Sequence, residues 1–241
     1  MSHETRPMSG KIGLITGASS GIGRAIALHL AASGATLWLT GRCAEKLRPL
    51  AETAPRAEIF TADLEAPEQV EALADTLARR GGGLDFLIHS AGAISRGAVE
   101  SAAAAELDRQ WNINLRAPYV ITQALLPLLK KSRGQIVFIN SSAGIHAVAG
   151  SAGYSATKHA LKGFADSLRA EVNPFGIRVV SLFVGRTATP MQESLHACEG
   201  RRYRPEKLIQ PGDVAALIAH VLNLPETVEV TALYLRPAQP S

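Results

Sequence analysis

The chain has 241 residues, of which 46% are hydrophobic, and it carries 25 basic and 21 acidic side chains. A chain of this length and hydrophobic content can bury one substantial core, which excludes a disordered protein and a small disulfide-stapled domain. Strand and helix patterns alternate without a linker-like stretch, so we expect one domain over residues 11–241, after a flexible N-terminal segment at residues 1–10.

The charge pattern does not favour a nucleic-acid partner. The net charge is +4, but the basic residues are scattered, and the densest groups are residues 130–133 and 201–204.

No uncharged apolar stretch reaches the roughly 18 to 20 residues that cross a bilayer. The only cysteines are Cys43 and Cys198, and residues 1–11 carry no apolar signal region. We therefore expect a soluble cytoplasmic protein with no membrane partner.

Short apolar runs with strand composition recur along the chain, and stretches with helical spacing separate them. The runs are residues 12–16, 35–40, 57–61, 84–89, 135–140, 177–183 and 228–235. Continuous apolar runs such as residues 136–139 require both faces of a sheet to be covered. The sequence therefore predicts a single doubly wound, Rossmann-like α/β domain, with a mostly parallel seven-stranded sheet and helices on both faces.

Helix start and stop signals agree with this pattern. Gly34 follows a predicted helix at about residues 22–32 as a C-terminal cap. Pro67 is placed to begin another helix, and Pro211 with Asp213 begins the one near the end of the chain.

The glycine-rich turn at residues 16–23 lies between the first predicted strand and the first predicted helix. Glycines let the backbone turn sharply and approach a pyrophosphate, while free N–H groups at a helix N-terminus attract the anion. The strand before and the helix after make a dinucleotide site more probable than a plain turn. The residues predicted to bind the cofactor here are Gly17, Ser19, Ser20, Gly21, Ile22 and Gly23.

The end of the second strand carries information about which cofactor binds. An acidic residue there binds ribose hydroxyls and repels a 2′-phosphate, but this chain has Gly41 followed by Arg42. An arginine at this place pairs with a phosphate, which favours NADP(H) over NAD(H). The alternative is that Arg42 is a solvated residue at a helix start.

Tyr154 and Lys158 begin a predicted helix and lie four residues apart, on one face and about 6 Å apart along the axis. A free phenol has a pKa near 10, and a nearby ammonium group lowers it. We therefore expect Lys158 to tune Tyr154 as an acid–base group.

The segment at about residues 185–210 is long, rich in Arg, Glu and Pro, and follows the C-terminal end of a predicted strand. Open α/β sheets bind ligands on that side, so the segment is either a lid over a substrate or a solvated surface excursion. Its charges give a weak indication of an acidic substrate. The basic residues are Arg186, Arg201, Arg202, Arg204 and Lys207, partly offset by Glu193, Glu199 and Glu206.

Taken together, Thr16–Gly17, Gly21, Gly23, Asn114, Ser141, Tyr154 and Lys158 resemble the classical short-chain dehydrogenase/reductase (SDR) family over nearly the whole chain. The resemblance implies that Tyr154 is the general acid toward a carbonyl, or the base toward an alcohol. It implies that Lys158 also holds the nicotinamide ribose and that Ser141 hydrogen-bonds the substrate oxygen, with Ser142 as a supporting hydroxyl.

The resemblance assigns further roles. Asn114 is similar to the family's helix-interrupting asparagine, which holds a water in a proton relay toward the lysine, and Asn112 is then structural. Asp63 resembles the family's adenine-contacting acid, although it could equally cap the helix at Pro67. The remaining cofactor contacts implied are Leu64, Ala91, Gly92, Gly185 and Thr189.

Two departures from the family pattern stand out. The family's Asn-Asn-Ala-Gly after the fourth strand reads His89-Ser90-Ala91-Gly92 here, which puts the hydrogen bonds of the polar residue in doubt. The usual Pro-Gly after the sixth strand reads Val184-Gly185, so we expect a less rigid start to the following loop.

The other candidate residues rank lower. His146 either faces substrate or is an exposed loop residue, and His196 with Cys198 is too sparse for a metal site, so no metal is expected. We expect Trp111, Phe164 and Phe175 in the core.

The resemblance thus implies an NADP(H)-dependent short-chain oxidoreductase. It would transfer hydride between the nicotinamide and a carbonyl or secondary alcohol, such as a ketone, an aldehyde, or a 3-oxo or hydroxy acid. It would act as a homodimer or homotetramer built on helices at residues 101–131 and 153–172. The alternative is a catalytically silent dinucleotide-binding sensor or interaction protein on the same fold.

Overall fold

The computed structural model describes residues 8–54 and 56–239. One seven-stranded sheet runs through it in the order β3-β2-β1-β4-β5-β6-β7, and every pairing between neighbouring strands is parallel. The strands are β1 (Ile12–Thr16), β2 (Thr36–Gly41), β3 (Ala57–Thr61), β4 (Phe86–His89), β5 (Gln135–Ser141), β6 (Arg178–Val184) and β7 (Ala232–Leu235). The predicted doubly wound α/β fold is confirmed, and the strand order reverses between β1 and β4.

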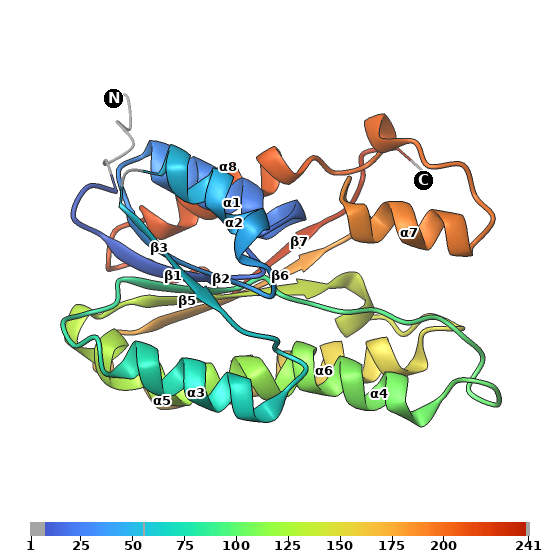
Figure 1. The fold of residues 1–241 in the computed structure, drawn as a ribbon, viewed down its shortest axis with the longest axis horizontal. Helices are drawn as coiled ribbons and strands as arrows, with labels where there is room; N and C mark the ends of the chain where they lie inside the picture. Colours follow the sequence, from blue (N-terminus) through green and yellow to red (C-terminus); the bar gives the residue numbers. More distant parts are fainter. Residues whose placement is uncertain (1–7, 55, 240–241) are drawn as a thin grey trace.

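Helices cover both faces of the sheet (Figure 1). One face carries α1 (Gly21–Ala32), α2 (Ala44–Thr53) and α8 (Pro211–Leu222). The other carries α3 (Pro67–Ala78), α4 (Ala104–Trp111), α5 (Ala117–Ser132) and α6 (Ala152–Val172). A further helix, α7 (Pro190–Cys198), lies beyond the end of β6. The predicted helix starts at Pro67 and Pro211 are confirmed, and Gly34 follows α1 with a φ of 93°, as a C-terminal cap requires.

The core has two apolar clusters, one on each face of the sheet. Strand β5 shows why: Val137 and Ile139 face the cluster beneath α1 and α8, whereas Ile136 and Phe138 face the cluster beneath α3, α5 and α6. Side chains of a strand alternate between the faces, so a run that is apolar at every position needs cover on both sides.

Strand β7 begins later than its apolar run suggests. The backbone at residues 228–231 is held by side chains of other elements: Arg178 donates to the Val228 carbonyl at 2.9 Å, and Arg169 donates to the Thr231 carbonyl at 3.1 Å. The Val228 carbonyl is thus satisfied by a guanidinium group instead of a neighbouring strand. The Thr231 carbonyl also accepts the Ser181 N–H of β6 at 3.0 Å, directly before the ladder starts at Ala232.

Two of the aromatic side chains expected in the core are not there. Trp111 is 46% exposed and Phe175 is 49% exposed, and of the three only Phe164 packs against a core cluster. Trp111 ends α4 on its solvent side, and Phe175 lies in the short turn at Asn173–Phe175, so helical and turn geometry turns both rings outward.

The predicted flexible segment falls largely on residues 1–7, which lie outside the described residues. Of the rest, Met8 is buried in the core cluster beneath α1, and its carbonyl accepts the Lys11 N–H at 3.1 Å. Across residues 8–54 and 56–239, none of the helices combines the length and hydropathy needed to cross a bilayer.

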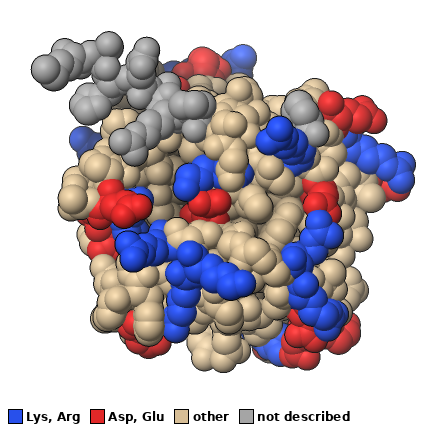
Figure 2. Space-filling view, turned by 90° about the vertical axis from the view of Figure 1, so that its left-hand side faces the viewer, with Lys and Arg blue, Asp and Glu red and all other residues tan. Residues whose placement is uncertain are grey.

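The face at the amino ends of the strands carries mixed charge (Figure 2). Basic side chains are prominent on it, with acidic side chains among them. Lys11 pairs with Asp85 at 2.8 Å, and Arg80 pairs with Glu58.

Candidate active site

A cleft of about 920 Å³ runs along the carboxyl ends of the strands. Its walls come from the glycine-rich turn, the loops after β2 to β6, the start of α6 and the helix α7. The residues predicted to bind cofactor or substrate all line it, except Asn114, which is buried beneath it. Those lining it are Gly17, Ser19, Ser20, Gly21, Ile22, Gly23, Arg42, Asp63, Leu64, Ala91, Gly92, Ser141, Tyr154, Lys158, Gly185 and Thr189.

The glycine-rich turn is packed so closely that side chains would not fit. Gly17 has a φ of 68°, and a Cβ there would lie 2.7 Å from the backbone of Ala91. A Cβ at Gly23 would lie 2.4 Å from the Gly17 carbonyl oxygen. The Thr16 hydroxyl accepts the N–H groups of Ser90 at 3.2 Å and Ala91 at 3.3 Å, which fixes the turn against the loop after β4. Helix α1 therefore begins with bare backbone at the cleft, as anion binding requires.

Arg42 and Asp63 lie at the end of the cleft formed by β2 and β3. The Arg42 side chain is exposed. The Asp63 carboxylate accepts the Glu65 N–H at 3.1 Å, whereas the residue that precedes α3 is Ala66, and no side chain caps that helix. The helix-capping alternative for Asp63 is therefore wrong, and its carboxylate shapes a turn at the cleft.

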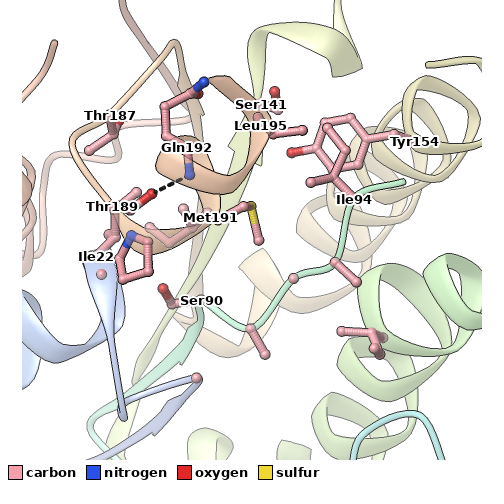
Figure 3. Close-up of a pocket in the computed structure, with 18 of the residues that line it drawn as sticks. Ile22, Ser90, Ile94, Ser141, Tyr154, Thr187, Thr189, Met191, Gln192 and Leu195 are labelled. Carbon is pink, nitrogen blue, oxygen red and sulfur yellow. Dashed lines mark hydrogen bonds between the residues drawn. The ribbon is translucent and has the colours of Figure 1, made fainter. Parts of the chain in front are cut away.

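Ser141 ends β5, and Tyr154 stands in the first turn of α6. Figure 3 shows the Tyr154 phenol reaching toward Ser141, with Leu195 and Ile94 beside them, and both hydroxyl-bearing residues line the cleft. Asn140 joins their elements: its side-chain oxygen accepts the Ser141 N–H at 2.7 Å, and its side-chain NH₂ group donates to the Lys158 carbonyl at 3.1 Å. The two catalytic candidates thus converge on one point of the cleft.

Burial governs the protonation of both Tyr154 and Lys158. It raises the pKa of Tyr154, and the hydrogen bond from Ser141 acts in the opposite direction. It lowers the pKa of Lys158 to about 8. The lysine Nζ lies 5.8 Å from the centre of the tyrosine ring and donates to the Ile139 carbonyl at 3.2 Å.

The expectation that Lys158 lowers the Tyr154 pKa is therefore wrong for this structure. Helical spacing places the two groups on one face, but it does not reveal that Lys158 is buried and Tyr154 half-buried. Desolvation disfavours the charged form of each group, so it opposes phenolate and ammonium alike.

Asn114 lies in a π-helical segment, Asn112–Arg116, between α4 and α5, so the expected interruption of the helix is confirmed. Its side-chain amide donates to the Ala93 carbonyl at 2.9 Å and to the Thr157 hydroxyl at 3.0 Å, and its oxygen accepts the Ala93 N–H at 2.8 Å. Thr157 in turn donates to the Tyr154 carbonyl at 2.9 Å. The side chain therefore ties the loop after β4 to α6.

Residues at both departures from the family pattern contact other elements of the fold. His89 contacts the Thr122 hydroxyl of α5 at 2.9 Å through Nε2 and stacks on Phe138, and burial lowers its pKa to about 3, so the ring is neutral. After Val184, the Gly185 N–H donates to the Leu235 carbonyl at 2.8 Å, and a Cβ on Gly185 would lie 3.1 Å from Pro237. The start of this loop thus bonds to β7 and lies close to the residue Pro237 after it.

The segment 185–210 contains α7, which the sequence pattern did not indicate. Thr189 caps this helix by accepting the Gln192 N–H at 3.2 Å, and the base of the segment is closed by a bridge between Thr187 and Ile209. Figure 3 shows Thr189, Met191 and Leu195 on the cleft side. The inner face of α7 buries Gln192 and His196, which are polar, so helical hydrophobic periodicity is absent.

His196 is used inside this segment. Its Nδ1 contacts the Gln192 carbonyl at 2.8 Å, and its ring meets that of Tyr203 edge-on at 5.4 Å. In the part of the chain that the structure describes, no three His, Cys, Asp or Glu side chains gather as metal ligands.

Sequence reasoning missed three residues of the site. Asn140 and Thr157 position the catalytic candidates, and Arg109 lines the cleft. Asn140 could have been found, because a polar residue directly after the apolar run 136–139 is unusual inside a parallel sheet. Arg109 has no sequence signal, since only the fold brings α4 to the cleft.

Comparison with known proteins supports the family resemblance over most of the chain. A family model described as short chain dehydrogenase matches residues 11–200. An uncharacterized short-chain type dehydrogenase/reductase of Sinorhizobium fredii is 33% identical over 232 residues, covering 94% of this chain and 91% of that protein.

Solved structures extend the likeness to the fold. An alcohol dehydrogenase from the archaeon Thermococcus sibiricus, complexed with 5-hydroxy-NADP, is 28% identical with a TM-score of 0.85, covering 96% of this chain and 99% of that one. A short chain dehydrogenase from Escherichia coli, complexed with NADPH, is 32% identical with a TM-score of 0.86, covering 98% of this chain and 100% of that one.

The buried lysine predicts a pH-dependent stability. Because its folded pKa of about 8 lies below the ordinary value of 10.5, burial of the ammonium group costs stability at every pH below about 8, and the cost disappears between these two values. The shift corresponds to about 3 kcal/mol, and loss of the bond to Ile139 offsets about 1 kcal/mol of any gain. We expect Lys158→Met to be more stable than the native chain by about 2 kcal/mol at neutral pH.

Urea unfolding at neutral pH and above the ordinary lysine pKa measures this difference. The control is Lys162→Met, one turn further along α6, where the ammonium group is exposed and pairs with Asp166 at 2.7 Å. A Lys158→Met gain that persists unchanged in alkali, or a loss of stability at neutral pH, would contradict the assignment.

Proposed function

The chain belongs to the short-chain dehydrogenase family of oxidoreductases, and we propose that it transfers hydride between NADP(H) and a carbonyl or secondary alcohol. One observation carries the proposal. The hydroxyl groups of Ser141 and Tyr154 meet in the same cleft whose other wall is a glycine turn too tight for a Cβ.

The residues of the cleft fit a nicotinamide dinucleotide. The bare turn at Gly17 and Gly23 and the start of α1 suit a pyrophosphate, and the exposed Arg42 suits a 2′-phosphate at the far end. The solved relatives with bound NADP-type cofactors support the same choice. Gly185 and Thr189 would hold the nicotinamide end, because both line the cleft beside the catalytic hydroxyl groups.

In the proposed reaction the bound nicotinamide supplies or accepts the hydride. Ser141 donates a hydrogen bond to the substrate oxygen and so stabilises the negative charge that develops there. Tyr154 donates its proton to that oxygen during reduction and takes it back during oxidation. Burial keeps the Tyr154 phenol protonated, which prepares it for reduction.

Lys158 and Asn114 support this proton transfer in different ways. Lys158 lines the cleft beside Tyr154, with a pKa of about 8, so it remains mostly charged at neutral pH and replenishes the proton. The Asn114 side chain is fully engaged with Ala93 and Thr157. Its part in a proton relay would therefore fall to its backbone carbonyl, in the π-helical segment where regular helix bonding is interrupted.

We also propose that the segment 185–210 acts as a lid, that the enzyme works in the cytoplasm, and that it assembles as a homodimer or homotetramer. The lid is supported by α7, whose residues Met191 and Leu195 face the cleft (Figure 3).

Assembly is supported by exposed apolar side chains on α4 and α5, namely Leu107, Trp111 and Tyr119. The compartment is supported by two free cysteines in separate parts of the fold.

Tyr154→Phe removes the proposed acid and leaves the walls of the cleft in place. We expect kcat with a responsive ketone to fall by at least about a hundredfold, while NADPH binding stays within about twofold. NADPH absorbance with ketones, aldehydes and 3-oxo acids measures turnover, and a fluorescence titration measures binding. Tyr119→Phe is the matched control, since that ring is half exposed and packs on Phe164.

Turnover that survives in a clean Tyr154→Phe preparation would sink this mechanism. Tight NADPH binding by the native protein without turnover of any compound would instead favour the silent sensor.

Gly41→Asp tests the choice of cofactor. A Cβ at Gly41 would lie 3.4 Å from the Ser19 hydroxyl, an ordinary contact, so the substitution fits the fold. A carboxylate beside Arg42 repels a 2′-phosphate, so we expect the NADPH dissociation constant to rise at least about tenfold and that of NADH to stay level or fall. Gly41→Asn, which has the same shape without the charge, should leave the preference nearly intact. An unaltered preference in Gly41→Asp would refute the assignment.

The assembly is tested by light scattering coupled to size exclusion. We expect a mass of two or four chains of 25.5 kDa. A monomer at micromolar concentration would contradict the oligomer.

A further inference from the structure

Three guanidinium groups line the substrate end of the cleft: those of Arg96, Arg109 and Arg186. Of the basic residues in segment 185–210 that suggested an acidic substrate, only Arg186 is among the described residues that line it. Arg96 and Arg109 come from elsewhere, the loop after β4 and the helix α4. The positive charge of this wall is therefore assembled by the fold.

The charges at this wall do not cancel. Glu199 directly follows α7, and its side chain is 13% exposed. Its carboxylate forms ion pairs with Arg96 at 3.0 Å, Arg186 at 2.9 Å and Arg201 at 3.6 Å. One carboxylate thus faces three guanidinium groups. Arg109 forms an ion pair with Glu106 at 2.9 Å, which balances its charge. The excess positive charge lies with the group around Glu199, of which Arg96 and Arg186 reach the cleft.

Arg96 is the better placed of these two to bind an anion. Arg186 directs Nη2 to both oxygens of Glu199 and Nη1 toward His196, whereas Arg96 contacts one oxygen of Glu199 through one nitrogen. Among the described residues this is the one ion pair that Arg96 forms. Further N–H donors of its guanidinium group are therefore available to a ligand. A guanidinium group presents five donors and matches a carboxylate in two-point geometry.

The backbone on both sides of Arg96 is fixed. The Ser95 N–H donates to the Gln110 side chain at 3.1 Å, and the Gly97 N–H donates to the Gly150 carbonyl at 3.0 Å. Gln110 is itself buried and bonded to the Glu106 carbonyl. Because the loop is anchored before substrate arrives, little ordering cost remains for binding there.

Apolar side chains lie beside the catalytic hydroxyl groups. Figure 3 shows Ile94 and Leu195 beside Tyr154 and Ser141, with Met191 nearby. Ile94 precedes Arg96 by two residues, and Leu195 precedes Glu199 by four, with the Glu199 N–H bonded to the Leu195 carbonyl at 2.9 Å. Ile94, Leu195 and Arg96 thus line the same cleft as the catalytic hydroxyl groups.

We propose that the substrate is a carboxylic acid with a short aliphatic body, whose carboxylate pairs with Arg96 while its oxo or hydroxyl oxygen meets Ser141 and Tyr154. This rests on the proposed function and names its substrate class. Arg186 and Glu199 hold the Arg96 side chain in place.

Paired substrates test this directly. Straight-chain oxo acids of increasing length are compared with their methyl esters, which keep the carbonyl and lose the charge. For the native enzyme we expect kcat/KM to favour at least one acid over its ester by about ten- to a hundredfold, the range of hydrogen bonds to charged groups. Arg96→Gln should remove that preference by lowering kcat/KM for the acid, with the ester and the KM for NADPH within about twofold of native.

Arg201→Gln is the matched control, because Arg201 contacts the same carboxylate without lining the cleft, and it should retain the preference. Arg96→Lys, which keeps the charge without the fork, should retain part of it, and thermal melting confirms that each variant folds.

An equal fall for acid and ester in Arg96→Gln would overturn the proposal, since Arg96 would then only brace the wall. A native enzyme that turns over esters or neutral ketones as well as acids would also overturn it while leaving the oxidoreductase function standing. A native enzyme inactive on every oxo compound would contradict the proposed function itself.

Discussion

The candidate site depends on keeping an ammonium group out of water at the carboxyl end of the sheet. Lys158 is 4% exposed, and its Nζ is bonded to the Ile139 carbonyl at the end of β5. Desolvation of that charge has to be offset elsewhere in the fold. The offset comes from apolar packing of the rest of α6, where Leu161, Ala165 and Leu168 join the core cluster on that face. The strands and helices thus hold a group in a state that it would not adopt in solvent.

Two buried side-chain amides bond the segments around Lys158 to one another. Asn140 bonds Ser141 and the Lys158 carbonyl, while Asn114 bonds Ala93 and Thr157. These amides connect three segments that are distant in sequence: the end of β5, the π-helical segment and the start of α6. A fully satisfied network of this kind is rigid, so it fixes hydroxyl positions without help from a ligand. The interrupted helix at Asn112–Arg116 is the geometric consequence of aiming one amide inward.

Much of the fold could be predicted from the sequence, because local signals agreed with one another. The apolar runs gave the strands within a few residues, and Pro67 and Pro211 marked helix starts. What failed depended on tertiary surroundings. Helix α7 escaped because its inner face is polar, and the Tyr154 pKa was misjudged because spacing says nothing of solvent access. Arg109 could not be assigned to the cleft, since helical spacing does not reveal which part of the fold a residue of α4 faces.

The closed base of segment 185–210 has an evolutionary consequence. Its two ends meet at the Thr187–Ile209 bridge, where the Ala188 N–H donates to the Ile209 carbonyl and the Ile209 N–H to that of Arg186. Residues inserted or deleted between these ends alter neither the register of β6 nor the start of α8. The wall that faces the catalytic hydroxyl groups can thus be exchanged as a module, so descendants of this scaffold can acquire new chemical preferences while inheriting the nucleotide half unchanged.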